Sequence, residues 1–116
     1  MMLQVEQSGK ITIVALPPIT RITASPPIEE IREGLEKILA SDTTKALIID
    51  LKNVEYGGTR LLSTLVMIHI RAKKLGKRLK ICNASEFVAD GLSQTHLDQI
   101  LEVYDTLEEA LVRFIV

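Results

Sequence analysis

Alternating polar and apolar positions open the chain and predict an antiparallel hairpin. The stretch MLQVEQSGKITIVALP, residues 2–17, alternates on both sides of Ser8-Gly9, which is typical of two half-buried strands joined at a small turn. The second strand ends at Pro17-Pro18. Beyond it, the β-branched run ITRIT at residues 19–23 predicts either an edge strand or an ordered loop.

Helical spacing begins after the second proline pair. Apolar residues then recur at intervals of three and four, at Ile28, Ile31, Leu35, Ile38 and Leu39. This spacing predicts an amphipathic helix that starts near Ile28. Ser25 is its candidate cap, and Glu29 and Glu30 stand where the positive end of the helix dipole favours acidic side chains.

The segment KALIIDL, residues 45–51, is apolar almost without interruption. A continuous run of this kind predicts a strand covered by helices on both faces, and therefore the centre of the sheet. Helical spacing returns after Gly57-Gly58 and lasts to Gly76, a residue suited to the left-handed position that ends helices. The apolar positions of this long helix are Leu61, Leu62, Leu65, Ile68, Ala72 and Leu75.

The C-terminal third repeats the strand and helix alternation. KRLKICN (77–83) and ILEVYD (100–105) predict strands, whereas ASEFVADGLSQT (84–95) and TLEEALVRFIV (106–116) predict helices, the last with Thr106 and Glu109 at capping-box spacing. No internal repeat or linker interrupts the pattern. The sequence therefore predicts one α/β domain over residues 1–116, with a partly parallel sheet and an antiparallel pair at its N-terminus.

Composition removes several classes of function. The 116 residues carry a net charge of -1, so no broad electrostatic attraction to nucleic acid or to anionic membranes is expected. The longest uncharged apolar run, LLSTLVMIHI, is shorter than the roughly 20 residues of a membrane-spanning helix. Cys82 is the single cysteine and is predicted to be an inert buried thiol. With no secretory signal pattern, this favours a reducing, cytoplasmic compartment.

Few residues indicate catalysis. The two histidines, His69 and His96, have no partners at metal-ligand spacing, so we expect a partly buried His69, a solvated His96, and neither a metal nor a cofactor. A phosphate-binding glycine motif and a nucleophile elbow are also missing. A basic series follows the long helix, and we expect it to offset the helix dipole and aid solubility rather than bind an anionic partner: Arg71, Lys73, Lys74, Lys77, Arg78 and Lys80.

The junction Gly57-Gly58-Thr59 is the most informative stretch. It follows the central strand, and ligands or partners of open α/β sheets meet the carboxyl ends of the strands. Thr59 is a candidate N-cap of the long helix. The same position suits a phosphate, because free backbone N–H groups and Arg60 would lie near the added charge.

A second stripe runs along the long helix beside its core stripe. Thr59, Ser63, Met67, Ile70 and Lys74 fall on one side of the helical wheel, apart from Leu61, Leu65, Ile68 and Ala72. If Met67 and Ile70 are exposed, the stripe is a docking strip for a partner. If they are covered, the helix is simply buried on more sides.

The order of elements resembles the STAS domain, the fold of bacterial anti-sigma factor antagonists. The resemblance is carried by ALIIDLKNVEYGGTRLLSTLVMIHIRAKKLGKRLKICNAS and LDQILEVYDTLEEAL. It implies a single mixed α/β sheet with helices packed mainly on one face. In that family an Asp-Ser-Ser-Gly run heads the long helix, and a kinase that is also the anti-sigma factor phosphorylates its first serine. Here the run reads Gly58-Thr59-Arg60-Leu61, which puts Thr59 at the phosphorylated position.

The resemblance implies a non-catalytic anti-sigma factor antagonist whose partner is an anti-sigma factor/Ser-Thr kinase. The implied contact residues are Gly57, Gly58, Thr59, Arg60, Ser63, Met67 and Ile70, with release on phosphorylation of Thr59. Two alternatives stay open. One is a STAS scaffold without phosphorylation, a subunit of a signalling assembly or a homo-oligomer. The other is a small enzyme or phosphocarrier that uses Asp50, Glu55 or His69 near the Gly57-Gly58 loop.

Overall fold

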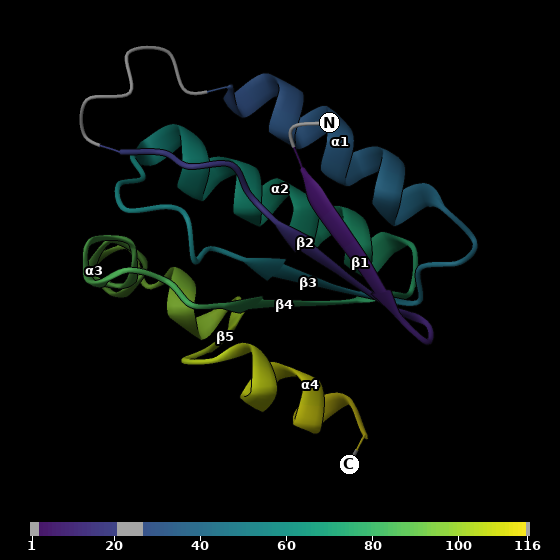
Figure 1. Ribbon diagram of the computed structural model, residues 1–116. Coiled ribbons are helices and arrows are strands. Elements are labelled where there is room, and N and C mark those ends of the chain that lie inside the picture. The colour runs from purple at the N-terminus through teal and green to yellow at the C-terminus, as the bar shows by residue number, and fades with distance from the viewer. Residues whose placement is uncertain (1–2, 21–26, 116) are drawn as a thin grey trace.

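A five-stranded mixed sheet forms the centre of the protein. The computed structural model describes residues 3–20 and 27–115 (Figure 1). The strands are β1 (Gln4–Ser8), β2 (Ile11–Ala15), β3 (Ala46–Asp50), β4 (Arg78–Cys82) and β5 (Glu102–Tyr104). They lie in the order β1-β2-β3-β4-β5. β1 is antiparallel to β2, and each following neighbour is parallel, as predicted.

Helices cover the two faces of the sheet unequally. They are α1 (Ile28–Ala40), α2 (Thr59–Lys74), α3 (Glu86–Gln94) and α4 (Leu107–Ile115), with a 3-10 turn η1 (Leu97–Gln99) after α3. The large core joins α1, α2 and α3 to one face, while α4 packs on the other through Ala110 against Ile13, Ile48 and Cys82 (Figure 1). This confirms the predicted α/β fold with helices mainly on one face.

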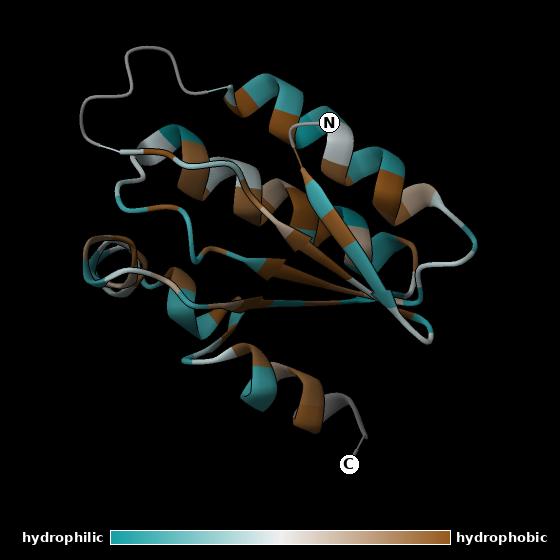
Figure 2. Cartoon of the chain, in the orientation of Figure 1, coloured by the Kyte–Doolittle hydropathy of each residue, from teal (hydrophilic) through white to brown (hydrophobic). Residues whose placement is uncertain are grey.

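The central strand is β3. All five of its residues are buried, and Figure 2 shows it as mostly hydrophobic, whereas β1 is largely hydrophilic. Parallel pairing puts Ala15, Asp50 and Cys82 side by side in one row across the sheet. The predicted position of KALIIDL at the centre of the sheet is confirmed.

Local signals at turns and helix ends are also confirmed. Gly9 and Gly76 have φ angles of 60° and 70°, values that favour glycine because they belong to the left-handed region. The Thr106 hydroxyl accepts a hydrogen bond from the Glu109 N–H at 3.2 Å. The Ser85 hydroxyl likewise accepts one from the Val88 N–H at the start of α3. Ser25, the candidate cap of α1, lies outside the described residues.

The segment after β2 adds one more connection to the sheet. Ile19 forms an isolated parallel bridge with Val54, in the loop after β3. The remainder of the predicted ITRIT strand or loop, residues 21–23, is not among the described residues.

Three expectations were wrong in detail. Leu75, expected as the last apolar position within the long helix, is its C-cap instead and is 45% exposed. The last strand covers only Glu102–Tyr104, because the chain before it turns through η1. Lys80 is fully buried in β4, beneath α4, instead of joining the surface basic series. Its ammonium donates to the Ala110 carbonyl at 3.2 Å and lies 4.9 Å from the centre of the Tyr104 ring.

Two other members of that basic series have structural partners. The Lys77 ammonium donates to the carbonyls of Leu39 and Ser41 at the end of α1, which offsets the negative end of that helix dipole. Arg78 pairs with Glu102 on the neighbouring β5. No described helix has the length and apolar character needed to cross a membrane.

Candidate functional site

Thr59 is the first residue of α2, and Gly58 is its N-cap. Gly58 is extended, with φ -97° and ψ -165°, and its carbonyl accepts the Leu62 N–H at 3.2 Å. The predicted capping role of Thr59 is therefore wrong, because the helix begins one residue earlier than such a role requires and no side chain caps it. The Thr59 side chain is exposed instead, at the positive end of the helix dipole.

The two glycines before Thr59 differ in how much space there is for a side chain. A Cβ added at Gly57 would lie 2.3 Å from Cδ2 of Leu61, whereas a Cβ at Gly58 would meet no atom within 4 Å. Leu61 is itself buried in the core, at 1% exposed. A side chain at position 57 would therefore force the end of Leu61 to move, because the first turn of α2 folds back over this glycine.

The second stripe of α2 lies on the surface. Its members Thr59, Ser63, Met67, Ile70 and Lys74 are all exposed, and the two apolar ones, Met67 and Ile70, are each 49% exposed. The core stripe is buried, as predicted. Of the two interpretations of this helix, exposure of the second stripe is therefore correct. We call these five residues the α2 strip.

A hollow lies on each side of the α2 strip. A groove of about 440 Å³ runs between α2 and the α3–η1 segment and is lined by Thr59, Leu62, Ser63, Val66, Met67, Thr95 and Leu97. A smaller hollow of about 190 Å³ faces α1 and is lined by Glu36, Met67, Ile70, Arg71 and Lys74. Met67 lines both, so the strip and its flanks make one uneven surface with an apolar middle.

The charge on α2 has one sign. Its sixteen residues include Arg60, Arg71, Lys73 and Lys74 and no acidic residue. Arg60 also acts on α1: the pKa of Glu29 is lowered mainly by the hydrogen bond from Arg32, and the positive charges of Arg32 and Arg60 add to this effect. Arg71, Lys73 and Lys74 lie in the last turn of α2, so the positive charge next to Thr59 is that of Arg60.

The loop that leads into α2 is tied to two other parts of the chain. The N–H groups of Glu55 and Tyr56 both donate to the Ile19 carbonyl, at 2.9 and 3.2 Å. On the other side, the Ser85 hydroxyl donates to the Glu55 carbonyl at 2.9 Å. The rings of Tyr56 and Phe87 stack with their centres 4.2 Å apart.

Sequence reasoning missed these ties. The low aromatic content, 3%, makes Tyr56 and Phe87 unusual in this chain, but only the fold shows that they meet.

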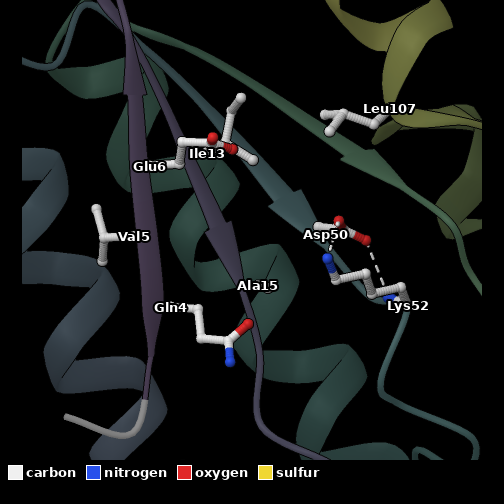
Figure 3. Close-up of a pocket in the computed structure, with 8 residues that line it drawn as sticks. All are labelled: Gln4, Val5, Glu6, Ile13, Ala15, Asp50, Lys52 and Leu107. Atoms are coloured by element: carbon white, nitrogen blue, oxygen red, sulfur yellow. Dashed lines mark hydrogen bonds and ion pairs between the residues drawn. The ribbon is translucent and has the colours of Figure 1, made fainter.

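Asp50, a candidate for acid or base chemistry, lies elsewhere. Its carboxylate is on the α4 side of the sheet, beside a hollow of about 310 Å³ that Figure 3 shows between β1, β2 and Leu107. One oxygen, Oδ1, accepts both the Lys52 N–H and the Asn83 side-chain amide at 3.0 Å. Asp50 is buried, and these bonds fix the chain where β3 and β4 end.

The three residues of the enzyme alternative do not form one site. Asp50 faces α4, His69 is a partly buried residue of α2, and Glu55 is exposed in the loop before α2. His96 is exposed, as predicted. Within residues 3–20 and 27–115, no three His, Cys, Asp or Glu side chains form a group that could hold a metal.

Cys82 is a buried, free thiol. Burial raises its pKa to about 12, and the negative charges of Asp50 and Glu108 act in the same direction. A thiol with so high a pKa is almost entirely protonated at neutral pH and is a poor nucleophile. The expected inert, buried cysteine agrees with this environment.

Sequence comparison decides the family. The profile of the STAS domain matches residues 3–110. The chain belongs to the STAS domain family. The STAS fold is also found by structural comparison, in proteins of low sequence identity.

Three solved structures illustrate the likeness of this STAS domain. The STAS domain protein of Planctomyces limnophilus, an anti-sigma-factor antagonist, has 23% identity and a TM-score of 0.84, with 98% of each chain covered. A putative anti-sigma factor antagonist of Thermotoga maritima has 21% identity and a TM-score of 0.85, with 97% of this chain and 93% of that one covered. The Bacillus cell fate determinant SpoIIAA in its phosphorylated form has 14% identity and a TM-score of 0.69, with 97% and 98% covered.

Proposed function

We propose that this STAS domain is a non-catalytic, cytoplasmic anti-sigma factor antagonist that works by partner switching and so regulates transcription. In its unmodified form it binds an anti-sigma factor with Ser/Thr kinase activity through the Gly57-Gly58 loop, Arg60 and the α2 strip. Phosphorylation of Thr59 by that partner weakens the contact. The observation that carries the proposal is the exposed Thr59 side chain at the head of an exposed, partly apolar strip.

The position of Thr59 suits a switch for a physical reason. A phosphate adds about -1.5 to -2 charges. At the first residue of α2 it lies at the positive end of the helix dipole and beside Arg60, so the folded domain accommodates it. A partner seated in the groove beside Thr59 would have to bury that charge, and it would dissociate more readily. The neighbour SpoIIAA, which is described in a phosphorylated form, supports this chemistry.

A second candidate function is a STAS scaffold that binds its partner without being phosphorylated. It is favoured by Gly58 and Arg60, which stand where the family motif has aspartate and serine. In this alternative the α2 strip still binds, and Thr59 contributes only to contact. An enzyme or phosphocarrier has less support, because Asp50 and His69 lie apart.

Phosphorylation is tested by incubating the protein with its anti-sigma kinase and ATP and locating the phosphate by mass spectrometry. We expect one phosphate on Thr59 in the wild type and in Ser63→Ala, which removes the next hydroxyl of the strip. Thr59→Ala should take none. A phosphate at another residue, or none in the wild type, would leave the scaffold as the better function.

Binding is tested by calorimetric titration of the same kinase. Thr59→Asp places one negative charge at the head of the strip, while Thr43→Asp places the same charge at an exposed threonine after α1. We expect at least a tenfold loss of affinity for Thr59→Asp and wild-type affinity for Thr43→Asp. Equal affinities for both variants would contradict the proposed switch.

A further inference from the structure

Strand β1 leaves one edge of the sheet open. Within the described part of the chain it pairs only with β2, and all five of its residues are exposed. The other edge strand, β5, has three residues and is flanked by η1 and α4. Natural proteins usually protect an edge with proline, lysine, a bulge or a covering element. β1 has an unbroken register with β2 and a single charge, at Glu6, so its edge is poorly protected.

The hairpin determines which backbone groups point outward from β1. Ser8 and Ile11 flank the two-residue loop, and residues in that position exchange backbone hydrogen bonds with each other. Hydrogen-bonded residues then alternate along the strand. Glu6 and Gln4 share the phase of Ser8 and bond to β2, which leaves the N–H and C=O of Val5 directed away from the sheet.

The side chains of β1 alternate in the same way. Figure 3 shows Val5 on one side of the strand and Gln4 and Glu6 on the other. Val5 is an apolar residue in the middle of this open edge strand, and 47% of its surface is exposed. Such a residue is suited to a contact that covers both its side chain and its backbone.

We propose that β1 pairs antiparallel with β1 of a second copy of this chain, with the two-fold axis at Val5. The two Val5 residues then exchange both backbone hydrogen bonds and place their side chains against each other. Gln4 of each copy faces Glu6 of the other, so a side-chain amide meets a carboxylate. The two sheets join into one continuous ten-stranded sheet with matching faces.

Register selects this arrangement over its neighbours. A two-fold axis at Glu6 would place two carboxylates directly opposite each other, which is unfavourable. A slip of one residue would bring the two faces of the sheet out of match. Centring on Val5 avoids both and pairs an apolar residue with itself.

The self-association is expected to be weak and dependent on concentration. The ladder is centred on Gln4, Val5 and Glu6 of each strand, with Leu3 opposite Gln7 at its two ends. This is far less contact than the interfaces of stable dimers, which bury about 1,200–2,000 Å². It uses no residue of the α2 strip, so its test is independent of the proposed switch.

The first measurement is sedimentation equilibrium of the wild type up to millimolar protein. We expect the average mass to rise toward that of a dimer, and Val5→Lys to remain at the monomer mass while keeping its fold by circular dichroism. A wild type that stays monomeric over the whole range would overturn the proposal.

Disulfide trapping then tests the register. Val5→Cys places two thiols opposite each other at the axis, within the Cα separation of 5.5 Å typical of a hydrogen-bonded pair and suitable for a disulfide. Buried Cys82 does not compete. We expect rapid cross-linking of Val5→Cys, and of a mixture of Gln4→Cys with Glu6→Cys, but slow cross-linking of Glu6→Cys alone. Faster cross-linking of Glu6→Cys than of Val5→Cys would overturn the register.

Discussion

Gly57→Ala tests how tightly Gly57, in the loop before α2, packs against Leu61 in the first turn of that helix. The added methyl group would be 2.3 Å from Leu61 Cδ2 and 3.4 Å from Leu61 Cγ. Leu61 is 1% exposed, so its side chain has little space into which to rotate. We expect a loss of stability, because a packed core responds to an extra methyl group by shifting side chains or backbone.

The expected size follows from similar overpacked cores. Inserting a methyl group into a well-packed core costs about 1–3 kcal/mol. Since only the end of one leucine has to move, the lower half of that range, about 1–2 kcal/mol, applies here. Gly58→Ala is the matched control: its Cβ meets nothing within 4 Å and its backbone is extended. Gly58 is the N-cap, where alanine is less favourable than glycine, but alanine also restricts the unfolded chain. Because these two effects oppose each other, we expect the stability of this variant to stay within about 0.5 kcal/mol of the wild type.

The measurement is urea unfolding followed by far-ultraviolet circular dichroism, because the chain has no tryptophan. Gly57→Ala should lower the midpoint and leave the slope unchanged, while Gly58→Ala should do neither. Equal midpoints for the two variants would show that Leu61 relaxes without cost. The close packing of α2 on the loop would then contribute nothing measurable to the free energy of unfolding.

Three further changes have definite expected outcomes. Gly91→Ala should stabilise the protein by about 0.5–1 kcal/mol, since Gly91 lies within α3 and its added Cβ would be at an ordinary 3.5 Å from Leu62; thermal unfolding measures this. Asp50→Ala should cost about 1–3 kcal/mol by leaving the Lys52 N–H and the Asn83 amide without their acceptor, as urea unfolding would show. Cys82 has a folded pKa raised from 9.0 to about 12, so its contribution to stability is complete below pH 9 and is lost as the pH rises toward 12. Unfolding free energies of the wild type should therefore fall with pH more steeply than those of Cys82→Ala, by up to about 1.4 kcal/mol per pH unit.

Elements with strong local patterns could be predicted from the sequence. The continuous apolar run of β3 and the three-four spacing of α1 and α2 determine which segments must be covered. Glycine at positive φ and hydroxyls at helix starts then mark turns and ends, as Gly76 and Thr106 show. The exposure of Met67 could be proposed from the helical wheel but not decided, since it depends on what packs beside α2.

Features that depend on distant segments were beyond the sequence. A lysine such as Lys80 is expected on the surface from its charge, and only the packing of α4 over β4 buries it. Thr59 was expected to cap α2, but the boundary of a helix after a glycine pair is set by how the loop enters it. The ties of that loop to Ile19 and Ser85 join residues far apart in the chain. Neither propensity nor spacing indicates such contacts.

Those ties also determine how a modification at Thr59 could be sensed. Glu55 and Tyr56 before α2 are held by Ile19 on one side and by Ser85 and Phe87 on the other, so we expect a phosphate on Thr59 to leave this part of the loop in place. A partner protein would then meet the same backbone in both states and would distinguish them by the phosphate group itself and by its charge. The electrostatic part of that discrimination weakens as salt is added, because mobile ions screen charge but not shape.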